Sequence, residues 1–271
     1  MIPVAAANPD LRRRLPLRLG TTSYIYPAAI LPNVRSLRNR VDDIEIVLFE
    51  SDEVSNYPRP REIGELAAIG EESGLSYTVH LPLDLFLGDP DPRIRQSSVN
   101  KCLRAIAATS GLKPHAYIVH FQGSPTEDHR RWLDESWLMR LDQSVGQILD
   151  HLEAPRLLCA ETLSYPFQVV EDLIERRDLG ICLDVGHIIL YHQRLDLYLQ
   201  RYLPRTRVIH LHGNSDGRDH QDLSRLPAAT LDLVFASLAA RPTAGDLVLT
   251  LEIFSEEDLR ISRTIVEKYF P

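Results

Sequence analysis

The most constraining feature of this sequence is an alternation of short apolar runs with longer segments of helical periodicity. Several runs are almost entirely apolar, as in parallel strands that are covered on both faces. The eight predicted strands are Leu17–Thr22, Ile44–Glu50, Tyr77–Leu81, Tyr117–Phe121, Leu157–Glu161, Ile181–Val185, Val208–His212 and Leu247–Phe254. The predicted helices are Glu62–Glu72, Val99–Thr109, Trp132–Leu152, Phe167–Arg177, Leu195–Tyr202, Leu226–Leu238 and Glu256–Tyr269.

This alternation over 271 residues predicts an α/β fold, a (β/α)8 TIM barrel, because such barrels take about 250 residues. No GxGxxG or GxxxxGK[ST] motif follows the first predicted strand, so the usual signatures of a nucleotide-binding doubly wound sheet are missing. No Gly- or Ser-rich linker divides the chain. We therefore predict a single domain, 1–271, with residues 1–16 as an N-terminal extension.

The charge balance and the hydropathy pattern bear on partners and location. Acidic residues outnumber basic ones by 38 to 30, for a formal net charge of −8, whereas proteins that grip nucleic acid usually present a basic face. No apolar run reaches the ~18–20 residues that span a bilayer, and the N-terminal apolar stretch is too short for a signal peptide. We expect a cytoplasmic protein with no nucleic-acid or membrane partner. The sequence leaves the oligomeric state open.

The carboxyl ends of predicted strands three to eight, and the segments that follow them, carry imidazole or carboxylate side chains. In a barrel these ends meet at the face that holds the active site. Imidazole and carboxylate are ligands of zinc, manganese and similar ions, and a cation offsets the cost of confining unpaired carboxylates. The candidate metal ligands are His80, His120, Glu161, Asp184, His187, His210, Asp219, His220 and Glu252.

His212 shares one side of its predicted strand with His210, since side chains alternate with period two. The sequence leaves three roles open for His212: a ligand, a donor to a ligand, or a substrate contact.

This series of residues resembles the xylose-isomerase-like, apurinic-endonuclease-type TIM-barrel superfamily, from Leu17 to about Phe254. The resemblance implies one of two chemistries. Sugar isomerases and epimerases use one ion, held at positions that correspond to Glu161, Asp184, His210 and Glu252. Phosphodiesterase-type members use up to three zinc ions, with further ligands that correspond to His80, His120, His187 and an Asp/His pair.

The Asp/His pair departs from the endonuclease pattern, which separates the two residues by one position. Here Asp219 and His220 are adjacent, and Asp216 is a substitute acidic ligand. On this reading Glu161 bridges two ions. His80 and His120 complete one site, and His187 with His220 holds a third ion. The second site is completed by Asp184, His210 and Glu252.

Several phrases narrow the resemblance to the cobamide-remodelling phosphodiesterase family: LGTTSYIYPAAILPNV, VLFES, YTVHLPLDL, CLDVGH, YLPRTRVIHLHG and LTLEIFS. This family implies hydrolysis of the nucleotide-loop phosphodiester of vitamin B12-type corrinoids, which gives cobinamide phosphate and the lower-ligand nucleoside. It implies two or three divalent ions, zinc by preference with manganese as the alternative. Glu161 and Glu252 are the candidate catalytic residues.

Four residues are predicted to contact the substrate: Ser23, Tyr24, His212 and Arg218. The first two follow strand one, and Arg218 stands beside the Asp/His pair, where it could meet a phosphate. The long connection Pro82–Arg95 is a candidate lid. Two other functions stay open: a one-ion sugar isomerase or epimerase, and a corrinoid-binding barrel without catalytic activity.

Overall fold

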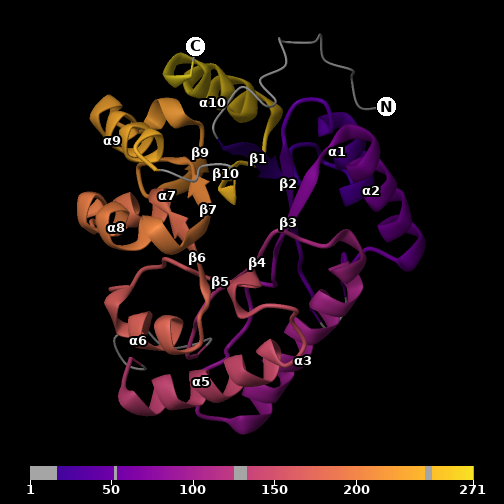
Figure 1. Ribbon diagram of the computed structural model, residues 1–271, viewed down its shortest axis with the longest axis vertical. Helices are drawn as coiled ribbons and strands as arrows, with labels where there is room; N and C mark the ends of the chain where they lie inside the picture. Colours follow the sequence, from indigo (N-terminus) through magenta and orange to yellow (C-terminus); the bar gives the residue numbers. More distant parts are fainter. Residues whose placement is uncertain (1–16, 52–53, 125–132, 242–245, 271) are drawn as a thin grey trace.

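The computed structural model describes residues 17–51, 54–124, 133–241 and 246–270. Eight parallel strands close into a barrel in the order β1-β10-β7-β6-β5-β4-β3-β2, and helices surround them (Figure 1). The predicted (β/α)8 barrel is confirmed. The proposed extension at 1–16 lies outside the described residues. The barrel strands are β1 (Arg18–Thr22), β2 (Asp43–Val47), β3 (Ser76–His80), β4 (Tyr117–Val119), β5 (Leu158–Glu161), β6 (Gly180–Asp184), β7 (Thr206–Leu211) and β10 (Val248–Leu251).

Each predicted helix has a counterpart in the structure, with shifts at most of the ends, and two helices of the described residues, Ile30–Leu37 and Val185–Leu190, were not predicted. Two pairs of bounds are identical, Leu195–Tyr202 and Glu256–Tyr269. The predicted helix Trp132–Leu152 is described over Glu135–Leu149, and Trp132 lies outside the described residues. The helices are α1 (Ile30–Leu37), α2 (Pro60–Ser73), α3 (Pro92–Thr109), α5 (Glu135–Leu149), α6 (Gln168–Arg176), α7 (Val185–Leu190), α8 (Leu195–Tyr202), α9 (Ala228–Ala239) and α10 (Glu256–Tyr269).

The start of α3 shortens the connection after β3, which was predicted to run over Pro82–Arg95. Pro92 occupies the first turn, where its missing N–H leaves no bond unmade, and the Asp91 side chain accepts the backbone N–H of Arg93 at 2.8 Å. The helix therefore begins seven residues before the predicted Val99, and the connection after β3 ends at Asp91. Within the described residues, no helix combines the length and apolar character needed to cross a membrane.

Two elements that the sequence did not predict lie at the carboxyl end of the barrel. One is the short helix α7, which follows β6 directly. The other is a two-stranded antiparallel hairpin after β7, formed by β8 (Gly213–Ser215) and β9 (Arg218–Gln221). Both carry histidines of the predicted ligand set.

The inside of the barrel has an apolar floor. Polar side chains lie above it, two residues further along the same strands toward their carboxyl ends. The floor consists of buried residues at alternate strand positions, Ala116, Ile118, Cys159, Cys182, Val208 and Val248. Because strand side chains alternate, the residues two positions after four of these also face inward. They are His120, Glu161, Asp184 and His210. The two strand cysteines are free buried thiols.

Candidate metal centre

Four side chains from neighbouring strands converge at the carboxyl end of the barrel, and we call them the inner cluster: Glu161, Asp184, His210 and Glu252. Each is at least nine-tenths buried, and one ligand atom from each lies within 4.8 Å of the others. His210 Nδ1 lies 3.1 Å from Glu252 Oε2, 3.6 Å from Asp184 Oδ2 and 3.7 Å from Glu161 Oε1. The cluster thus combines three carboxylates with one imidazole nitrogen.

Unpaired atoms in the inner cluster fit a bound cation. Each of its members has a buried oxygen or nitrogen that makes no hydrogen bond with the described residues: Glu161 Oε1, Asp184 Oδ2, His210 Nδ1 and Glu252 Oε2. Burying an unpaired carboxylate is costly, and a divalent ion converts that cost into attraction. A mixed oxygen and nitrogen donor set suits zinc or manganese.

The second oxygen of Glu161 faces a different pair of ligands. Its Oε2 lies 3.2 Å from His80 Nε2 and 3.0 Å from His120 Nε2, and the two imidazole rings are close to perpendicular, with centroids 5.0 Å apart. These three side chains form a second group whose ligand atoms converge. One carboxylate therefore stands between two ligand sets, which is the arrangement of a bridging ligand.

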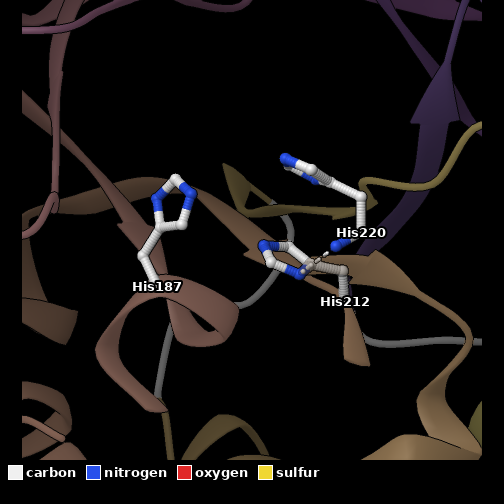
Figure 2. Close-up of side chains that lie close together, drawn as sticks. All are labelled: His187, His212 and His220. Atoms are coloured by element: carbon white, nitrogen blue, oxygen red, sulfur yellow. Dashed lines mark hydrogen bonds between the residues drawn. The ribbon is translucent and has the colours of Figure 1, made fainter. Parts of the chain in front are cut away.

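A third group, the outer histidines, consists of His187, His212 and His220, which come from α7, the end of β7 and β9 (Figure 2). The Asp184 side chain caps α7 by accepting the backbone N–H of His187 at 2.6 Å, so one residue serves both the helix and the inner cluster. Gly186 has no side chain to block this packing, since a Cβ there would come within 2.1 Å of the His212 ring.

The backbone of His220 is held in the left-handed region, with φ of 52°. Non-glycine residues visit this region rarely, and such strain gathers at functional sites. The backbone N–H of His220 donates to His212 Nδ1 at 3.0 Å, the contact that Figure 2 marks. The hairpin is thereby fixed to the end of β7, with His220 turned toward the other histidines.

The structure narrows the three roles left open for His212. Its ring is fully buried, and Nε2 lies 3.3 Å from Asp184 Oδ1, which places it among the candidate ligands and their partners. If Nδ1 accepts the His220 N–H, a neutral ring carries its proton on Nε2 and faces Asp184 as a donor. If Nδ1 instead donates to the Gly213 carbonyl, 3.3 Å away, Nε2 is free to bind an ion. The two roles require opposite tautomers.

The buried charges compensate one another. Burial opposes ionisation of Glu161, but the charges of His120 and His210 hold the pKa of its carboxyl well below the usual value. Burial likewise opposes protonation of the histidines. The hydrogen bond to Glu161 nevertheless raises the pKa of His80 to about 9, and the charge of Asp184 raises that of His187 to about 10. A cation bound here would compete with these protons for the histidine nitrogens.

Two of the predicted acidic alternatives stand apart from the three groups. Asp219 is partly exposed, and its Oδ2 lies 3.7 Å from His220 Nε2. Asp216 lies in the hairpin turn with φ of 53° and lines a polar cavity of about 490 Å³ with Arg218. In the described part of the chain neither carboxylate belongs to a convergent group, and His212 takes the place beside His187 and His220.

The predicted substrate contacts after strand one have structural partners. Ser23 is fully buried and its Oγ accepts the backbone N–H of Val47 at 3.2 Å, so the side chain has a structural role, and its substrate contact stays a prediction. The hydroxyl of the partly buried Tyr24 accepts the amide of Asn56 at 2.8 Å. Arg218 is exposed, which leaves its predicted phosphate contact open.

Comparison with known proteins places the chain in a family. The profile described as "Xylose isomerase-like TIM barrel" matches residues 41–263. The chain belongs to this family. A search of curated protein sequences gave no match.

Solved structures with the same fold include members with different activities. A D-tagatose 3-epimerase-like protein has 18% identity and a TM-score of 0.75, with 93% of this chain and 97% of that chain covered. L-ribulose 3-epimerase has 17% identity and a TM-score of 0.69, with 94% of each chain covered. Endonuclease IV from Thermus thermophilus has 19% identity and a TM-score of 0.68, with 93% and 99% covered. At these identities the likeness establishes the fold alone.

Proposed function

We propose that this xylose isomerase-like barrel is a metal-dependent phosphodiesterase that opens the nucleotide loop of cobamides, giving cobinamide phosphate and the lower-ligand nucleoside. The observation that carries the proposal is the two-sided environment of Glu161. Its Oε2 lies within 3.2 Å of His80 and His120, and its Oε1 faces the inner cluster. A site for more than one ion suits phosphodiester cleavage, in which attacking and leaving oxygens both need stabilisation.

Exposed apolar side chains around the outer histidines favour a large substrate. Tyr191 and Phe254 are each about two-fifths exposed. Their rings lie 5.9 Å from the ring of His187 and 5.2 Å from that of His220, centroid to centroid. Farther from these histidines in sequence, Leu83 follows the carboxyl end of β3 and is 56% exposed. A corrinoid macrocycle could cover such surfaces. The net charge of −8 also agrees with a corrinoid substrate better than with a nucleic-acid backbone.

The reaction is a hydrolysis at phosphorus. The oxygen of a water molecule forms a new bond to phosphorus, the bond from phosphorus to the ribose oxygen breaks, and that oxygen leaves with a proton as the nucleoside hydroxyl. Divalent ions held here would polarise the phosphoryl oxygens and lower the pKa of a bound water toward ~7. Glu252 is the candidate acceptor of the water proton through its other carboxylate oxygen, because its Oε2 faces the inner cluster as a ligand atom. Glu161 contacts both groups of ligands and so fixes their positions relative to each other.

The test is a product assay with purified protein loaded with Zn²⁺ or Mn²⁺. Complete cobamides with several different lower ligands are supplied, and released nucleoside and cobinamide phosphate are measured by liquid chromatography with mass spectrometry. We expect both products in equal amounts, and none from the chelator-treated protein. Binding of coloured corrinoid without turnover by fully metallated protein would favour the non-catalytic barrel instead.

A one-ion sugar isomerase or epimerase is the second candidate. The inner cluster favours it, because Glu161 and Glu252 stand on either side of His210 and could hold an ion while moving a substrate proton. Such an enzyme has no need of His80 and His120 as ligands. One bound ion per chain, with epimerisation of a ketohexose that survives substitution of His80, would establish this candidate and exclude the phosphodiesterase.

A further inference from the structure

A fourth carboxylate lies behind the three of the inner cluster, on a strand that supplies none of the cluster's members. Glu45 lies in the middle of β2 and is fully buried. Its Oε2 lies 2.9 Å from Nε2 of His210, which is also fully buried. Strands β2 and β7 are not neighbours in the barrel, so this contact spans the barrel interior.

We propose that Glu45 is a positioning residue that fixes the tautomer and orientation of His210 for metal binding. A neutral imidazole has one N–H and one nitrogen lone pair. When Nε2–H donates to Glu45, the lone pair is left on Nδ1, the atom that faces Glu252, Asp184 and Glu161. Histidine ligands of metal sites are commonly held by such a carboxylate, which also makes the ring a better donor.

Packing alone does not explain a glutamate at this position. Glu45 Oε1 is buried and makes no hydrogen bond with the described residues, so the carboxylate keeps an unsatisfied oxygen among strands whose floor is apolar. An apolar residue would fill the same space without that cost. The carboxylate is accounted for if it serves His210.

Asp43 provides an internal contrast two residues earlier on the same strand. It faces the same side of β2 and is equally buried. Its oxygens are paired with hydroxyls of β3, with Ser76 Oγ at 2.6 Å and Thr78 Oγ1 at 2.8 Å. Both carboxylates add negative charge to the barrel interior, but within the described residues only Glu45 hydrogen-bonds to a candidate ligand. Asp43→Asn is therefore a matched control for Glu45→Gln.

The experiment measures zinc affinity by chelator competition in the full chain, without substrate. We expect E45Q to weaken the His210 site by about 10–100-fold, the usual effect of losing such a partner, while D43N stays close to the wild type. E45D, which keeps the charge on a shorter side chain, should recover part of the affinity. Wild-type affinity in E45Q, or an equal loss in D43N, would overturn the proposal.

The histidine tautomer gives a readout that does not depend on the variants folding. Imidazole nitrogen NMR shifts of zinc-loaded wild-type protein should show His210 protonated at Nε2 and bound through Nδ1. Protonation at Nδ1 would overturn the proposal even if E45Q failed to fold. Neither measurement involves a substrate. A failed cobamide assay therefore leaves the role of Glu45 intact, and failure of these measurements leaves the proposed phosphodiesterase activity intact.

Discussion

The inner cluster and the outer histidines differ in what holds them. The inner residues stand at the ends of barrel strands whose neighbours pair on both sides, and all are at least nine-tenths buried. In the outer group, His187 lies on a six-residue helix and His220 on a two-stranded hairpin, with 11% and 26% of their side chains exposed. Buried residues on rigid strands favour tight metal binding, whereas short peripheral elements unfold locally more easily. We expect ions held by the inner cluster and by the His80, His120 and Glu161 group to bind tightly. An ion held by the outer histidines should exchange more readily with solvent.

Glu161→Gln should have the largest effect, because Glu161 belongs both to the inner cluster and to the group that it forms with His80 and His120. We expect kcat to fall by on the order of 10³-fold, about 4 kcal/mol of transition-state stabilisation, together with loss of bound metal. The measurements are steady-state rates and elemental analysis. Glu171→Gln is the control, since Glu171 pairs with Arg201 on the outer surface. An E161Q protein with full metal content and more than a tenth of wild-type activity contradicts the bridging role.

His120→Ala should remove one ion and leave the inner cluster occupied. We expect a loss of roughly 100-fold in kcat/KM, or about 2.7 kcal/mol, because one of two bridged ions is gone. Elemental analysis should show one metal fewer per chain than in the wild type. His151→Ala is the control, because His151 is exposed. An unchanged metal count in H120A would mean that His120 is only a hydrogen-bond partner of Glu161.

His220→Ala should show how much the outer histidines contribute to catalysis. We expect roughly a tenfold fall in kcat/KM, about 1.4 kcal/mol, with the inner ions retained during dialysis against a weak chelator. A fall as large as that of E161Q would show that the outer histidines are as central as the inner cluster and would end the distinction between them.

The last prediction concerns the stability of the metal-free protein as a function of pH, and not its turnover. The raised pKa values of His80, about 9, and His187, about 10, mean that the folded chain binds more protons than the unfolded chain above pH ~6.5. Their contribution to stability is full below that pH and disappears as pH rises through 9 and 10. Urea unfolding between pH 6.5 and 10 should show this decline, reduced when zinc has replaced the protons. Rising stability of the metal-free chain over this range would contradict these pKa shifts.

Most of the barrel and its ligand ring followed from the sequence, because both depend on patterns that are local in the chain. Apolar runs predicted the strands, and polar residues at the run ends predicted His80, His120 and Glu161 at one face. Helix α7 escaped prediction because its six residues are too few for helical periodicity. The hairpin escaped because β8 and β9 lack a run of apolar residues.

Glu45 was missed for a different reason. The segment Asp43-Ile44-Glu45-Ile46 alternates charged and apolar residues, a pattern typical of a strand with one face in water. Only closure of the barrel puts the charged face inside, and only the three-dimensional structure brings Glu45 to His210, 165 residues away in sequence. The choice between the tautomers of His212 likewise depends on contacts that no local pattern contains.

The central claim is that this centre holds more than one ion, with Glu161 between them. The most direct measurement is the anomalous X-ray signal at the mouth of the barrel in crystals grown with Zn²⁺. The account predicts one peak between His80, His120 and Glu161, and a second among Glu161, Asp184, His210 and Glu252. A single peak confined to the inner cluster in fully loaded crystals would contradict the claim and favour the one-ion isomerase.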